Sequence, residues 1–113
     1  MATKILDISE YGYKGKTVSI REPTGSDMIA VNDYIIKEKK TKGDYNSYMT
    51  SLILLNRVIQ DAPFDKKVDT LKDLPVKLLT YLSDEVGKMM SPLAKKEEKA
   101  SSETTEEEES QTT

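Results

Sequence analysis

The chain has 113 residues and a mass of 12.7 kDa, which suits one small domain with a modest core. It contains neither cysteine nor histidine, and this excludes disulfides, zinc–thiolate sites and the commonest general base, so we expect no enzyme, no cofactor and no metal site. The formal net charge of −3 is uneven, since residues 1–94 carry 14 basic and 13 acidic side chains and residues 95–113 carry 3 and 7. A neutral body has no electrostatic footprint for nucleic acid.

Two short segments near the N-terminus alternate apolar and polar residues, as strands with one buried face do. They are Lys4–Ile8 and Thr17–Arg21. The loop between them contains Gly12 and Gly15, which can adopt positive φ. We therefore predict an antiparallel β-hairpin over residues 4–21, which must lay its apolar face on the helices because two strands alone are marginal in water.

A first helix is predicted over residues 25–41. Pro23 ends the second strand, Thr24 is a natural N-cap, and Asp27 stands at the third helical position, as in a capping box with a short acid. The apolar residues of one face are Met28, Val31 and Ile35. The lysine-rich end, Lys37–Lys42, is typical of a solvated helix C-terminus rather than a phosphate site, and Gly43 is a good terminator.

The stretch at residues 45–60 predicts the central element of the fold. Its apolar residues nearly encircle a helix, so it must be covered on more than one side by the segments before and after it. Asp44 is placed to cap its start, and Pro63 limits its end. A loop with the core anchors Phe64, Val68 and Leu71 follows.

A last helix is predicted over residues 74–91, opened by Pro75, with an apolar stripe at three- and four-residue spacing. Beyond Ala94 the sequence lacks aromatic and large aliphatic residues, which predicts a disordered acidic tail over residues 95–113. The expected fold is thus α+β and mainly α, a single domain over residues 1–94 in which a short N-terminal hairpin packs on about three helices.

Two tyrosines of the hairpin loop, Tyr11 and Tyr13, have two open interpretations. They are either exposed anchors for a partner or folded back onto the sheet. The acid pairs lack the spacing of a calcium loop. A helix-turn-helix is disfavoured because the helix after Gly43 carries Arg57 as its only cation. No apolar run reaches the roughly 18 residues of a membrane span, and no signal sequence is apparent, so we expect an intracellular protein that binds no membrane.

The segment Arg21–Asp27 has the form R-E-P-[ST]-x-x-D, contributed by Arg21, Glu22, Pro23, Thr24 and Asp27. With the preceding hairpin, the helical remainder and the charged tail, it resembles the tail assembly chaperones of long-tailed bacteriophages and prophages. The resemblance covers roughly residues 5–90. The acidic Ser/Thr/Glu run at the end of the chain departs from that family's pattern.

The resemblance implies a chaperone that binds the tape measure protein, keeps it soluble and helps to recruit tail-tube subunits. It implies action in the cytoplasm of the infected bacterial host, absence from the mature virion, and assembly into rings or other homo-oligomers. Family members are often also made in a longer frameshifted form, and Lys95–Lys96 would permit an A-rich slippery site. The alternatives are a permanent virion component, such as a connector or tail terminator, and a DNA-binding regulator.

A helical partner needs a holder with apolar surface and no catalytic group. We expect that partner to contact the hairpin and the exposed edges of the first and last helices. The candidate residues are Tyr11, Tyr13, Met28, Tyr34, Met89 and Met90.

Overall fold

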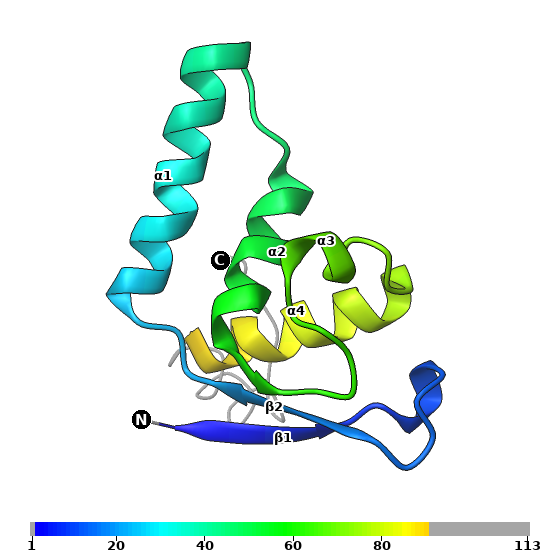
Figure 1. The fold of residues 1–113 in the computed structure, drawn as a ribbon. Helices are drawn as coiled ribbons and strands as arrows, with labels where there is room; N and C mark the ends of the chain where they lie inside the picture. The colour runs from blue at the N-terminus through cyan, green and yellow to red at the C-terminus, as the bar shows by residue number, and fades with distance from the viewer. Residues whose placement is uncertain (1, 91–113) are drawn as a thin grey trace, which may run out of the picture.

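The computed structural model describes residues 2–90 of the chain. These residues form a mainly helical α+β fold, with a three-stranded antiparallel sheet and four helices (Figure 1). The predicted fold class is therefore confirmed. The predicted acidic tail over residues 95–113 lies outside the described residues.

The sheet begins with the predicted hairpin. Strands β1 (Thr3–Asp7) and β2 (Thr17–Arg21) pair antiparallel with Ile5 opposite Ser19, and the short 3-10 helix η1 (Ser9–Tyr11) lies in the loop between them. The side chains on the helix-facing side, Leu6, Ile8, Val18 and Ile20, are all buried. β1 begins and ends one residue earlier than predicted, and Ile8 follows it as a buried loop residue.

A third strand, β3 (Ile59–Asp61), was not predicted. It pairs antiparallel with β2 and gives the sheet the order β1-β2-β3. The predicted central helix therefore ends at Val58 and not at residue 60, because Ile59 leaves the helix to pair with Ile20 and becomes almost fully buried. Pairing with β2 across nearly 40 residues of sequence outweighs the local helical pattern.

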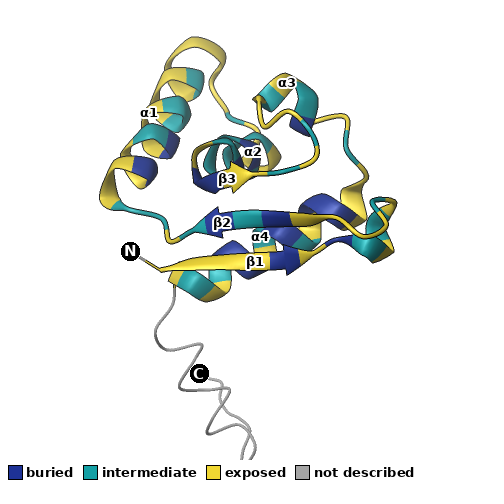
Figure 2. Ribbon diagram, turned by 60° about the horizontal axis from the view of Figure 1, so that its bottom comes forward, coloured by how far each residue is buried: buried dark blue, intermediate teal, exposed yellow. Residues whose placement is uncertain are grey.

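The helices are α1 (Gly25–Lys42), α2 (Ser47–Val58), α3 (Val68–Leu71) and α4 (Val76–Met90). Helices α2 and α4 cover one face of the sheet, whereas α1 rises away from it (Figures 1 and 2). The short helix α3 occupies the segment that we expected to be a loop, and its Leu71 is buried as predicted. The last helix begins at Val76, two residues later than predicted.

The helix ends show which of the predicted capping residues form caps. Thr24 and Asp27 form the predicted capping box at the start of α1, and Gly43 ends that helix with a φ of 80°. At the start of α2 the cap is Asn46 and not Asp44, since the Asn46 side chain accepts a hydrogen bond from the N–H of Tyr48 at 2.9 Å. Asp44 instead accepts from the adjacent N–H of Tyr45.

The core joins the sheet to α2, α3 and α4. Helix α2 contacts α1, α3, α4 and β3, so it is the central element, as its apolar pattern indicates. The buried apolar side chains form one cluster, made of Leu6, Ile8, Val18, Ile20, Leu52, Leu55, Val58, Ile59, Leu71, Leu78, Leu79, Leu82 and Val86. This arrangement sets α2 and α4 side by side over the sheet and creates the surface described next.

Candidate functional site

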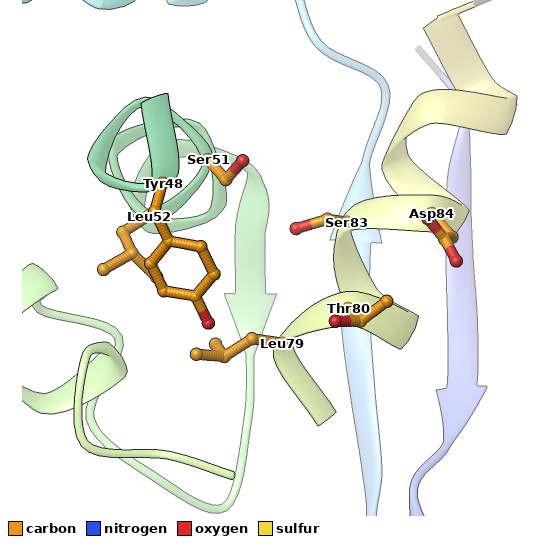
Figure 3. A pocket seen from close by; sticks show the side chains of 7 residues that line it. All are labelled: Tyr48, Ser51, Leu52, Leu79, Thr80, Ser83 and Asp84. Carbon is orange, nitrogen blue, oxygen red and sulfur yellow. The ribbon is translucent and has the colours of Figure 1, made fainter. Parts of the chain in front are cut away.

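A groove runs between α2 and α4. It consists of two adjoining hollows of about 150 and 170 Å³ that share Ser51 and Ser83. The first is lined by Tyr48, Ser51, Leu52, Leu79, Thr80, Ser83 and Asp84 (Figure 3). The second continues along the same two helices and is lined by Ser51, Leu54, Leu55, Ser83, Val86, Gly87 and Met90. We call these residues together the α2–α4 groove.

Small side chains make this groove possible. Ser51 of α2 and Ser83 of α4 stand at the junction of the two hollows, where larger side chains would close the space. Along α4 the lining runs from Leu79 to Met90, and at 1.5 Å per residue this is about 16 Å, or three helical turns. The walls are mostly apolar.

Gly87 is the most informative residue of the groove. A glycine inside a helix costs about 1 kcal/mol relative to alanine. A Cβ atom at this position would meet no other atom within 4 Å, so the chain's own packing does not require the glycine. Its effect is to leave the floor of the groove open beside Val86 and Met90.

The chemistry of the groove is that of a binding surface. Among its lining residues Asp84 and Tyr48 alone carry titratable side chains. The groove can therefore bury apolar side chains, offer hydroxyl groups to a backbone and pair a cation at its Asp84 rim.

A second, more open hollow lies along the other side of α4. It has a volume of about 370 Å³ and shares Thr80 and Asp84 with the groove. Its remaining lining residues are Tyr11, Val76, Lys77 and Tyr81. The rings of Tyr11 and Tyr81 stack with centroids 5.0 Å apart. Burial, with the nearby charge of Glu85 as a lesser cause, raises the pKa of Tyr81.

A buried ion-pair network fixes the segment Arg21–Asp27. The Arg21 guanidinium donates two hydrogen bonds to the Asp27 carboxylate, at 2.7 and 2.9 Å. Arg57 of α2 donates a third through Nε at 2.8 Å, and the N–H of Thr24 donates a fourth at 2.7 Å. Arg21 also donates to the carbonyl of Arg57 at 2.8 Å. One carboxylate thus joins β2, the start of α1 and the end of α2.

The electrostatics of this network are those of a structural element. The Asp27 side chain is almost completely buried. Hydrogen bonds from Arg21 above all, and then from the Thr24 N–H and Arg57, hold the pKa of the Asp27 carboxyl well below its usual range. With the Thr24 hydroxyl as a fifth donor at 3.2 Å, the Asp27 carboxylate is held in its charged form at neutral pH and anchors the three elements.

The structure separates the predicted partner-binding residues. Tyr11 and Tyr13 fold back and are half-buried, Tyr11 on Tyr81 and Tyr13 on Phe64, with ring centroids 5.6 Å apart in the second pair. Both rings are thus folded back, but onto α4 and the loop before α3 and not onto the sheet.

The other candidates lie on two helices. Met28 is exposed and Tyr34 half-buried on α1, whereas Met89 packs against the core and Met90 lies exposed at the end of the groove. Of the six predicted residues, Met90 alone belongs to the α2–α4 groove, and Tyr11 lies in the hollow across α4.

Sequence reasoning missed the residues that shape the groove and complete the ion-pair network. Ser83 and Gly87 lie four residues apart on the apolar side of the last helix, and this run of small residues was the available signal for a groove. Arg57 gave no local signal, because it is 30 residues from Asp27. The pairing of Arg21 with Asp27 adds a physical role to the motif R-E-P-[ST]-x-x-D.

No protein-family model, curated protein or solved structure matches the chain. Within residues 2–90 no group of three or more side chains is placed to hold a metal ion. None of the helices in that part of the chain has the length and apolar character needed to cross a bilayer.

Proposed function

We propose that the protein is a phage tail assembly chaperone that binds a long helical partner, the tape measure protein, in the α2–α4 groove. The observation that carries the proposal is this groove, which has mostly apolar walls and a floor of small residues. Helix-in-groove recognition uses such surfaces. The resemblance of the segment Arg21–Asp27 to tail assembly chaperones points to the same class of partner.

The dimensions of the groove define the helix that it would accept. Three turns along α4 match a partner helix with apolar or small side chains at positions i, i+4, i+7 and i+11. Ser51, Ser83 and Gly87 would let the backbone of that helix approach closely. Asp84 at the rim favours a lysine or arginine at the edge of the apolar stripe.

In the proposed role the chain acts in the cytoplasm of the infected host. It keeps the tape measure protein soluble while tail-tube subunits are recruited, and it leaves before the virion is complete. A permanent virion component, such as a connector or tail terminator, is the competing function. Its presence in purified particles separates the two.

The test is an affinity pull-down from cells in which the source phage or prophage is induced, with captured proteins identified by mass spectrometry. Three baits are compared: the wild-type chain, Gly87→Leu and Asp69→Leu. Gly87→Leu fills open space in the groove. Asp69→Leu places the same side chain on α3, at a position where the aspartate side chain is 94% exposed.

The proposal predicts that wild type and Asp69→Leu capture a very long, helix-rich protein and that Gly87→Leu captures at least tenfold less. The chain should be absent from finished particles. Equal capture by all three baits would remove the groove as the binding site. Capture of no such protein, or presence of the chain in particles, would contradict the chaperone function.

A further inference from the structure

We infer that the free edge of β1 is an interface between two copies of this chain, paired antiparallel so that their sheets join into one sheet of six strands. The inference is independent of the proposed function. It follows from the hydrogen-bond register of the hairpin and from the fact that both charged side chains of β1 are paired within the chain.

The register shows which backbone groups of β1 point outward. The N–H of Ile8 donates to the carbonyl of Lys16, and the N–H of Glu22 donates to the carbonyl of Ala2. Since hydrogen-bonded pairs alternate along an antiparallel ladder, the even-numbered residues of β1 bond to β2. The N–H and C=O groups of Thr3, Ile5 and Asp7 therefore point away from β2, along the outer edge of the sheet.

Edge strands are normally protected by charged side chains. β1 has two, and both are engaged within the chain. Lys4 forms an ion pair with Glu85 of α4, which draws its ammonium group to the helix side of the sheet. The Asp7 carboxylate accepts hydrogen bonds from the N–H and the hydroxyl of Ser9, at 2.9 and 2.6 Å. Ile5 remains at the centre of the edge, 72% exposed.

In one register of self-pairing, the outward N–H and C=O groups of β1 find hydrogen-bond partners and no like charges lie opposite each other. A two-fold axis through Ile5 pairs the free groups of Ile5 with the partner's Ile5 and those of Thr3 with the partner's Asp7. Centring the axis on Lys4 or on Asp7 would set like charges directly opposite each other, which is destabilising. Centring it on Leu6 would place Ile5 opposite an aspartate. Among the registers centred on residues 4 to 7, the Ile5 register alone places the exposed Ile5 opposite an apolar residue and opposes no like charges.

The area required for a stable dimer brings α4 into the interface. Stable interfaces bury about 1,000 Å² or more in total, which exceeds what a five-residue strand supplies. The Lys4–Glu85 ion pair places α4 beside β1, so the neighbouring part of this helix is available to add contact area.

The first experiment is sedimentation equilibrium of the full chain over micromolar to submillimolar concentrations. The wild type should be a dimer in that range. Ile5→Lys should raise the dimer dissociation constant at least tenfold, because it restores a charge to the edge. The matched control Ile29→Lys, which replaces an isoleucine 63% exposed on α1, should leave the constant unchanged.

Cysteine cross-linking tests the register without depending on Ile5→Lys, and the chain has no native cysteine. Paired at the two-fold axis, the Cα atoms at position 5 would be about 5.5 Å apart, within disulfide range. Ser19 lies opposite Ile5 on β2, so its two copies would be about 14 Å apart across three strand spacings. Ile5→Cys should therefore form a disulfide dimer under mild oxidation, and Ser19→Cys should not.

Three results would overturn the inference. They are a monomer at all concentrations, a dimer that Ile5→Lys does not weaken, and equal cross-linking at positions 5 and 19. A monomer that pairs with an extended peptide, or with residues 91–113 of its own chain, would also replace the second copy as the occupant of the edge.

Discussion

Helix α1 and the base of the molecule are stabilised in different ways. In the base, Val18, Ile20, Leu78 and Leu82 are completely buried between the sheet and α4. In α1, by contrast, Val31 is the one buried apolar side chain, and Met28, Ile29 and Ile36 are exposed. Figure 1 shows α1 extending beyond the rest of the fold. The base depends on apolar burial, whereas α1 is anchored mainly at its first turn.

Helix α1 is attached to the base mainly by charged groups. Asp27 is the other buried residue of this helix, and its partners Arg21 and Arg57 come from β2 and α2. Because the charges are paired and hydrogen-bonded, their burial is tolerated, but removing one partner leaves the others uncompensated. Loss of the network should therefore release α1 while the base stays folded.

The largest effect is expected in the base. Leu82→Ala should lower the free energy of unfolding by about 2–5 kcal/mol, because the side chain is fully buried and leaves a cavity. Val31→Ala in α1 is the control and should cost about 1 kcal/mol. Urea denaturation followed by circular dichroism measures both. Similar losses for the two variants would show that α1 packs as tightly as the base, and would contradict the view that the two regions are stabilised differently.

Asp27→Asn should have the next largest effect, lowering the free energy of unfolding by about 2–4 kcal/mol, because Arg21 and Arg57 lose their counter-charge. Asp33→Asn, an exposed position on the same helix, is the control and should change it by less than about 0.5 kcal/mol. Hydrogen exchange should show the greatest loss of protection in α1. Loss confined to the sheet would refute the anchoring role.

The same network predicts a dependence on pH. The pKa of Asp27 is lowered in the folded state, so the stabilisation is present above the unfolded value of about 4 and is lost as the pH falls toward the folded value. The difference in unfolding free energy between wild type and Asp27→Asn should therefore shrink from pH 5 to pH 2. A constant difference over that range would argue against a charged Asp27.

Two glycines should respond to alanine in opposite directions. Gly87→Ala should stabilise the fold by about 0.5–1 kcal/mol, because the added Cβ meets open space within a helix. Gly43→Ala should destabilise it by about 1 kcal/mol, since Gly43 ends α1 at a φ of 80°. Thermal unfolding of the two variants measures the difference. Destabilisation by Gly87→Ala would mean that the groove is tighter than described.

The smallest effect is expected on the exposed side of α1. Ile36→Ser should change the free energy of unfolding by no more than about 0.5 kcal/mol, because this side chain is largely exposed. The urea midpoint measures it. A loss above about 1 kcal/mol would show that this side of α1 is covered in solution and that α1, like the base, depends on apolar burial.

Local signals in the sequence predicted those parts of the fold that local chemistry decides. The hairpin followed from apolar alternation, the first turn of α1 from Thr24 and Asp27, and its end from Gly43. The central place of α2 followed from apolar residues on more than one side. In each case neighbours in the sequence supply the interactions.

The features that sequence reasoning missed depend on distant contacts. β3 forms because Ile59 pairs with Ile20, and a helical pattern continuing past Val58 conceals it. The third donor to Asp27 comes from Arg57 on another helix. The groove depends on how closely α2 and α4 approach each other, which Ser83 and Gly87 permit but do not dictate.

The most direct test of the central claim is a methyl NMR titration with the tape measure segment recovered in the pull-down. If the partner helix lies in the α2–α4 groove, the methyl signals of Leu54, Leu79 and Met90 should shift as the segment is added. Those of Ile29 and Ile36 on α1 should stay in place. Shifts confined to the α1 methyl groups would contradict the account.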